Sequence, residues 1–65
     1  MFQLVVHTYS DPKNSYIFEE VITFDYDDKF FVITDRDRNS AMFALADVMS
    51  VEVNRDVAYV DEVLN

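Results

Sequence analysis

Residues 16–34 read YIFEEVITFDYDDKFFVIT, and this stretch predicts two β-strands joined by a tight turn. Apolar residues recur at every second position on both sides of Asp27-Asp28, which is the period of a strand. An Asp-Asp pair between two such runs is typical of a two-residue hairpin. Glu19-Glu20 interrupts the alternation, so we expect a bulge there that re-phases the strand.

The position of the turn determines which side chains face each other across this hairpin. With Asp27-Asp28 at its centre, the expected cross-strand pairs are Phe24 with Phe31, Ile22 with Ile33, and Tyr26 with Lys29. In the same way, Ile22, Phe24 and Tyr26 are expected on one face, and Val21, Thr23 and Asp25 on the other. Apolar pairs that share a face stabilise a sheet, so this register predicts the core.

The remainder of the chain predicts further strands. Val, Ile, Phe, Tyr and Thr, which suit a pleated surface, make up 26 of the 65 residues. Strands are expected at residues 2–9, 16–26, 29–34, 41–46 and 48–54, with a corner at Asp47 and with Met49, Val51 and Val53 facing inward. Residues 56–64 fit a strand that pairs back on the fifth and a short helix equally well. We therefore expect one all-β domain over residues 1–65, an antiparallel meander of about five strands curled into a barrel or half-barrel.

The composition excludes several classes of site. The chain has no glycine, so the turns depend on its thirteen Asp and Asn residues, and the glycine-rich nucleotide-binding and nucleophile motifs are excluded. It has no cysteine, which excludes disulfides, iron–sulfur clusters and thiolate zinc sites. No apolar run approaches the roughly 20 residues of a membrane span, and the N-terminus lacks the basic region of a signal peptide. We expect a cytoplasmic protein without a cofactor.

Two side-chain patterns invite a metal or catalytic interpretation. Asp35-x-Asp37-x-Asn39 resembles the start of a calcium-binding EF-hand loop, but Ser40 and Ala46 stand where that loop needs glycine and glutamate. His7 is the only histidine, and the sequence places no nucleophile or second metal ligand beside it. We therefore expect no catalytic residue, no metal site and no enzymatic activity.

The charge of the chain predicts the kind of partner. Thirteen acids stand against five bases, and the net charge of −8 repels nucleic acid and anionic membranes. The expected partner is a basic protein, such as a nucleic-acid-binding enzyme, on which the chain docks as a regulator or inhibitor. A phage counter-defence protein of the anti-CRISPR type fits this profile by analogy alone.

The residues expected to contact this partner lie in two turns: Asp25, Asp27, Asp28, Asp35, Arg36, Asp37 and Arg38. The four tyrosines, Tyr9, Tyr16, Tyr26 and Tyr59, add the aromatic anchors that interfaces favour. The acids also have a simpler interpretation, because a net charge of this size keeps a small apolar protein soluble.

Self-association is the alternative function. Phe30-Phe31-Val32-Ile33 is apolar on both faces of the third strand, so Phe30 and Val32 need a cover. The C-terminal segment and a second copy of the chain both meet that need. In the second case the face of Phe30, Val32, Met42 and Ala44 holds a homo-oligomer together, and Val32→Asp is expected to disrupt it.

Overall fold

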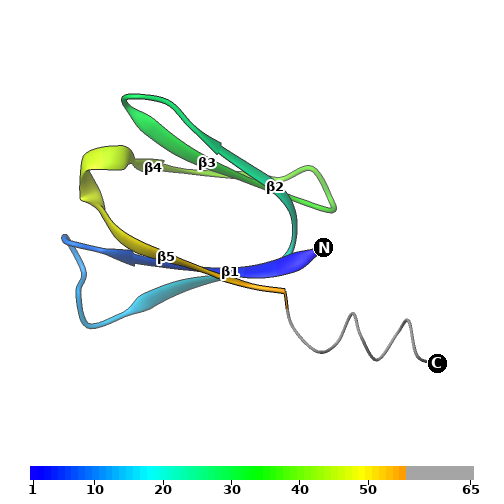
Figure 1. The fold of residues 1–65 in the computed structure, drawn as a ribbon, viewed down its shortest axis with the longest axis horizontal. Coiled ribbons are helices and arrows are strands. Elements are labelled where there is room, and N and C mark those ends of the chain that lie inside the picture. Colours follow the sequence, from blue (N-terminus) through cyan, green and yellow to red (C-terminus); the bar gives the residue numbers. More distant parts are fainter. Residues whose placement is uncertain (56–65) are drawn as a thin grey trace.

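The alternating segments form five antiparallel strands in the computed structural model, which describes residues 1–55. The strands are β1 (Phe2–Thr8), β2 (Ser15–Tyr26), β3 (Phe30–Asp35), β4 (Ser40–Ala44) and β5 (Val48–Asn54), and one 3₁₀ turn, η1 (Leu45–Asp47), joins β4 to β5 (Figure 1). The all-β prediction is confirmed. The alternatives for residues 56–64, a further strand or a C-terminal helix, fall outside the described residues, as does Tyr59.

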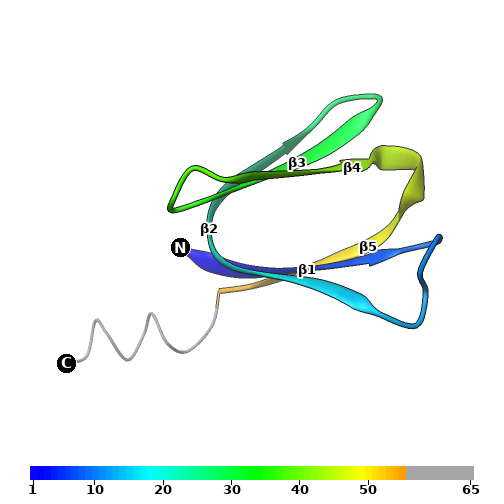
Figure 2. The ribbon, with the colours of Figure 1, turned by 180° about the vertical axis from the view of Figure 1, so that it is seen from behind.

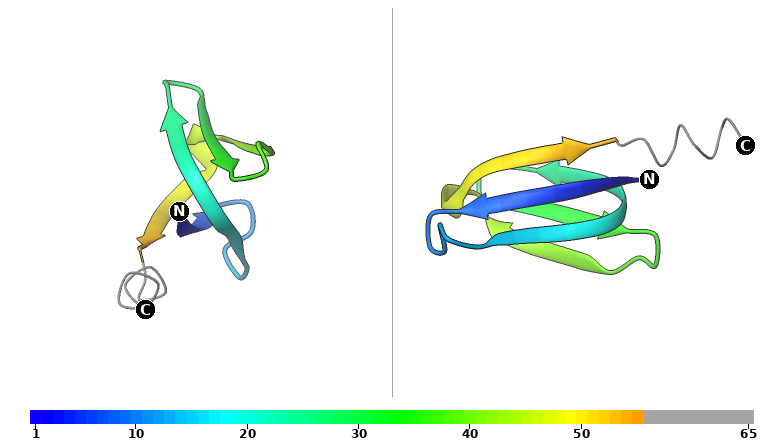
Figure 3. Two further views of the ribbon diagram at one scale, coloured as in Figure 1. Left: turned by 90° about the vertical axis from the view of Figure 1, so that its right-hand side faces the viewer. Right: turned by 90° about the horizontal axis from the view of Figure 1, so that it is seen from below.

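One sheet with the strand order β4-β3-β2-β1-β5 makes up the fold. The 12-residue strand β2 belongs to both halves of this sheet, because its first part pairs with β1 and its second part with β3. Figures 2 and 3 show β2 curving from one layer to the other, so that the sheet folds over itself without closing. This arrangement is the half-barrel that the short strands predict, with β5 returning to pair with β1.

The core fills the space between the two layers. Five apolar side chains are almost fully buried there: Leu4, Val6, Val21, Phe31 and Ile33. Phenylalanine rings close its margin, with the Phe24 ring 6.0 Å from that of Phe2 and 5.6 Å from that of Phe31. Each buried side chain of this size contributes about 1.5–3 kcal/mol, so the core of this small domain depends on every one of its members.

The predicted bulge at Glu19-Glu20 is confirmed. Leu4 of β1 pairs with Phe18, whereas Phe2 pairs with Val21, so β2 contains one more residue than β1 between these pairs. Glu20 takes up the extra length in a left-handed conformation, with φ of 54°. The bulge lies where β2 passes from one layer to the other, which is the bend that such an insertion produces.

The predicted faces of β2 are wrong at Val21 and Ile22. A second irregularity falls between Val21, which pairs with Asp35, and Thr23, which pairs with Thr34. Val21 is therefore completely buried, while 49% of the Ile22 surface is exposed. Two bulges follow each other within five residues, so the simple alternation of β2 does not continue through its bend.

The predicted hairpin register is also wrong. Phe24 pairs with Ile33 and Tyr26 with Phe31, so the turn centres on Asp28-Lys29 instead of Asp27-Asp28. Asp27 occupies the first turn position because its carboxylate accepts hydrogen bonds from the backbone N–H groups of Lys29 and Phe30. The shift moves the pairing by two residues, which changes the partners but leaves Phe24, Phe31 and Ile33 on the inner face.

Two further expectations fail near the junction of β4 and β5. The strand expected at 41–46 ends at Ala44, because Leu45 begins η1, and the bond from the Leu45 N–H to the Lys29 carbonyl is the last one in register with the β3–β4 ladder. Met49, expected inward, is 43% exposed. The pairing of β5 with β1 shifts between His7 and Thr8, and Val48 packs against the core instead.

Candidate functional site

Three segments that are distant in the sequence meet at one end of the half-barrel. They are residues 9–14, residues 25–30 and η1, all on the left of Figure 1. Asp47 of η1 is bonded to the segment of residues 9–14. Its backbone carbonyl accepts a hydrogen bond from the Tyr9 N–H at 2.9 Å, and its carboxylate accepts hydrogen bonds from Ser10. Leu45 of η1 is bonded to the segment of residues 25–30, because its N–H donates to the Lys29 carbonyl at 2.8 Å. We call these residues together the acidic end.

The acidic end combines negative charge with exposed aromatic rings. Its five carboxylates are those of Asp11, Asp25, Asp27, Asp28 and Asp47, against the two lysines Lys13 and Lys29. Tyr9 and Tyr26 are 61% and 65% exposed on the same end. Exposed tyrosine amid charge is a composition found at protein interfaces, where the ring supplies contact area and the charge selects the partner.

Most of these carboxylates also shape the backbone. Asp11 accepts from the Asn14 side chain, Asp25 from the Tyr26 N–H, Asp27 from its turn and Asp47 from Ser10. Asp28 makes no hydrogen bond within residues 1–55 and lies exposed at the centre of its turn. Of the five, Asp28 is therefore the acid that a substitution removes with the least effect on folding.

The turn at Asp27 predicts a pH effect on stability. The N–H groups of Phe30 and Lys29 hold the pKa of the Asp27 carboxyl below its ordinary 3.8. Because the folded pKa is depressed, the carboxylate stabilises the fold above pH 3.8, and this contribution is lost as the pH falls through the folded pKa. We expect Asp27→Ala to melt at a lower temperature than the wild type at pH 7, with the difference shrinking in acid.

Asp27→Asn is the matched control for this effect. The amide oxygen of asparagine accepts the same two hydrogen bonds but does not titrate, so this variant is expected to melt above Asp27→Ala at pH 7. Thermal unfolding followed by circular dichroism between pH 2 and 7 measures both variants, a range chosen to bracket an aspartate pKa of about 3.9. A constant difference between Asp27→Ala and the wild type across this range would contradict the assignment.

An apolar groove opens beside the acidic end. It has a volume of about 330 Å³ and lies between β5 and the β2–β3 hairpin. Its lining is Phe24, Tyr26, Phe31, Leu45, Val48, Val51 and Val53. Tyr26 also borders a smaller hollow of about 100 Å³ on the other side, with Asp25, Asp27, Phe30 and Val32. The Tyr26 side chain thus stands between an apolar groove and a hollow with two carboxylates.

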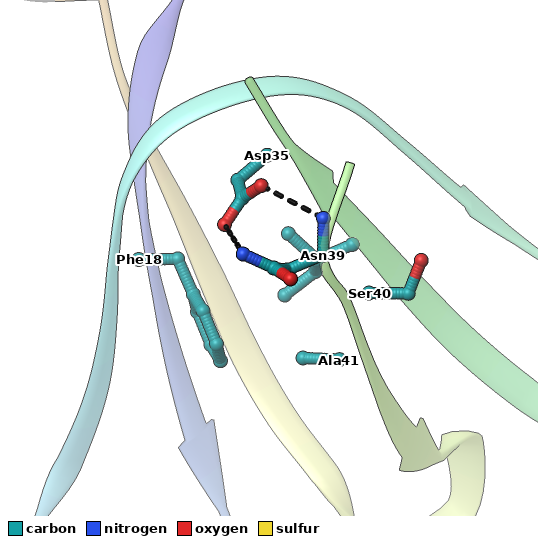
Figure 4. Close-up of a pocket in the computed structure, with 6 residues that line it drawn as sticks. Phe18, Asp35, Asn39, Ser40 and Ala41 are labelled. Carbon is teal, nitrogen blue, oxygen red and sulfur yellow. Dashed lines mark hydrogen bonds between the residues drawn. The ribbon is translucent and has the colours of Figure 1, made fainter. Parts of the chain in front are cut away.

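The other four predicted site residues lie at the opposite end of β3. Since β3 has six residues at about 3.3 Å each, Asp35 to Arg38 are roughly 20 Å from the acidic end. Figure 4 shows the Asp35 carboxylate directed at Asn39, where it accepts from the backbone and side-chain N–H groups and closes the turn. Arg36 pairs with Glu20 at 3.3 Å. The structure therefore does not join the two predicted clusters into one surface.

His7 lies in a cross-strand row on the outer face of β1. Its Nδ1 is 3.2 Å from the Ser15 hydroxyl, and its Nε2 is 3.6 Å from the Glu52 carboxylate. The sequence did not reveal this neighbourhood, because the three residues come from three strands. Ser15 and Glu52 are exposed to solvent, and no hollow described above adjoins them, so the row resembles a surface hydrogen-bond network more than a nucleophilic site.

Residues 1–55 contain neither a metal-binding cluster nor a membrane-spanning helix. No group of three or more histidine or acidic side chains in that range could hold a metal ion. Within the same residues, no helix has the length and apolarity that crossing a membrane requires. In comparisons with family models, curated protein sequences and solved structures, the chain has no significant match.

Sequence reasoning missed Asp11 and Asp47 as members of the acidic end. Both are isolated acids in the sequence, and only the contacts of η1 with the two turns place them at the same end of the half-barrel as Asp27 and Asp28 (Figure 1). The apolar groove was missed for the same reason, because β5 and the β2–β3 hairpin meet only in the folded chain. No local pattern marks either feature.

Proposed function

We propose that the chain is a binding protein whose acidic end docks on a positively charged macromolecule and regulates or inhibits it. The observation that carries this proposal is the position of exposed Tyr26 between an apolar groove and carboxylates. A basic amphipathic segment of a partner protein suits this surface, because its apolar side chains fill the groove while its lysines or arginines meet the surrounding acids.

The site residues of this proposal are a revision of the sequence prediction. Asp25, Asp27 and Asp28 remain, while Asp11, Asp47, Tyr9 and Tyr26 join them. The β3–β4 turn, Asp35 to Arg38, is left out because it lies at the other end of β3, roughly 20 Å from the acidic end. A basic nucleic-acid-binding protein is the partner class, since nucleic acid itself is repelled by the net charge of −8.

A matched pair of charge reversals tests the docking site. Asp28→Lys and Asp37→Lys change the net charge equally, but only the first lies on the acidic end. The partner is first captured from bacterial lysate at about 50 mM salt and released at about 500 mM salt, where surface attraction is screened. Its affinity for Asp28→Lys is expected to fall at least about tenfold, with little change for Asp37→Lys.

The contrary outcomes are equally clear. Equal losses in the two variants would show that net charge matters and the acidic end does not. Unchanged affinity in both variants would contradict electrostatic docking. Tyr26→Ala, a change at an exposed position, is expected to weaken binding by about tenfold if the ring is an anchor.

Self-association is the second candidate function, and the outer face of β3 and β4 favours it. Phe30 pairs with Ala44 and Val32 with Met42, so four apolar side chains adjoin each other. Phe30 is 42% exposed and Met42 is 62% exposed within the described part of the chain. Light scattering tests this candidate directly, because a monomer at high concentration would contradict it.

A further inference from the structure

The free edge of β4 is unusual in this acidic chain. β4 ends the strand order of the sheet, so the backbone on its outer side has no partner strand among residues 1–55. Its sequence, Ser40 to Ala44, contains no charged residue, and its pairing with β3 has no irregularity. The other edge, β5, carries Glu52 and a register shift, which are features that protect an edge from pairing.

The hydrogen-bond pattern shows which groups β4 presents outward. The Asp35 N–H donates to the Asn39 carbonyl before β4, and the Leu45 N–H donates to the Lys29 carbonyl after it. Bonded and non-bonded pairs alternate in an antiparallel ladder, so between these points Ala41 and Phe43 bond to β3. The N–H and C=O groups of Ser40, Met42 and Ala44 therefore point away from the sheet, and all three residues are exposed.

From this edge we propose that two copies of the chain pair through β4, antiparallel and centred on Met42, and so join their sheets into one. Met42 then exchanges both backbone hydrogen bonds with the partner subunit's Met42, and Ser40 pairs with the partner subunit's Ala44. The two edges are identical and self-complementary, as a two-fold interface requires. This inference rests on the self-association candidate and specifies its geometry.

Charge explains why a second copy suits this edge. Each copy carries a net charge of −8, so two copies approach most easily where neither presents a charge, and β4 is such a stretch. Antiparallel pairing also places the turn of residues 35–38, whose two aspartates and two arginines balance, beside η1 of the other copy with its Asp47. The Met42 side chains meet on the outer face and extend the apolar surface that begins at Val32.

Met42→Pro tests this geometry. Proline lacks the outward N–H of Met42, but β3 loses no hydrogen bond, since Met42 does not donate to it. Light scattering over a concentration series is expected to show a wild-type dimer and at least about tenfold weaker dimerisation for Met42→Pro. Met42→Ala keeps the N–H, and it is expected to remain a dimer.

Each other outcome overturns the inference in a recognisable way. A wild-type monomer removes both the inference and self-association. A dimer that survives Met42→Pro but is lost in Val32→Thr shows face-to-face packing and leaves self-association intact. Threonine is used because Val32 pairs with Asp25, so that Val32→Asp would set two carboxylates opposite each other. If Met42→Pro does not fold, amide exchange of the wild type decides, because slow exchange at Ser40, Met42 and Ala44 supports pairing and fast exchange contradicts it.

Discussion

Replacing Leu4 by alanine is expected to leave most of the chain unfolded at 25 °C. Leu4 is completely buried between the two layers, where it belongs to the cluster of Val6, Val21, Phe31 and Ile33. Truncating a buried leucine costs about 2–5 kcal/mol in free energy of unfolding. A core of this size supplies no more than about 3–5 kcal/mol of net stability, so one such loss is comparable to the whole.

The control for Leu4→Ala is Ile17→Ala. Ile17 also lies in a strand and loses a similar volume on truncation, but 59% of its surface is exposed. Its free energy of unfolding is expected to change by less than about 1 kcal/mol. Far-ultraviolet circular dichroism with urea titration measures both variants. A cooperative unfolding curve for Leu4→Ala close to that of Ile17→Ala would contradict the assignment of the core.

Val21→Ala is expected to destabilise the fold by about 2 kcal/mol, whereas Ile22→Ala costs less than about 1 kcal/mol. The order is the reverse of what side-chain size and the alternation of residues 16–26 suggest. The reason is the pair of register irregularities in β2, which bury Val21 completely and leave Ile22 49% exposed. The comparison is therefore a direct test of how β2 bends.

Urea midpoints of the two variants, measured side by side, provide the result. A larger loss of unfolding free energy for Ile22→Ala than for Val21→Ala would indicate that β2 alternates without interruption and bends elsewhere. The urea m-value is the internal check, because a change in m indicates altered compactness instead of altered stability alone. Thr23→Ala, an exposed position next to Ile22, is the control for a general loss of strand propensity.

Local patterns were sufficient for the strands and for one bulge. Alternation placed β1, β3 and β5 within about two residues, since the period of two reflects the geometry of a single strand. Glu19-Glu20 marked the first bulge because two adjacent acids cannot alternate with an apolar face. The same alternation predicted that the apolar side chains of Phe30 and Val32 lie on the outer face of β3.

These local patterns do not predict the cross-strand register. Asp27-Asp28 and Asp28-Lys29 are both plausible turn centres, and the choice depends on the bonds that the Asp27 carboxylate makes to Lys29 and Phe30. A shift of two residues preserves the faces, so the hydrophobic pattern cannot distinguish the two registers. The second irregularity, at Ile22, had no marker in the sequence because it arises from the bend between the layers.

Composition and the period of two are properties of neighbouring residues, so local sequence is enough to predict an acidic all-β protein of short antiparallel strands without glycine turns. Which acids share one end of the molecule depends instead on tertiary contacts. The tertiary fold separates Asp35 and Asp37 from Asp27 and Asp28, places Asp11 and Asp47 at the same end of the half-barrel as the latter, and forms the groove that Tyr26 lines. These groupings depend on how strands distant in the chain are paired, and pairing is decided by the burial of the whole core.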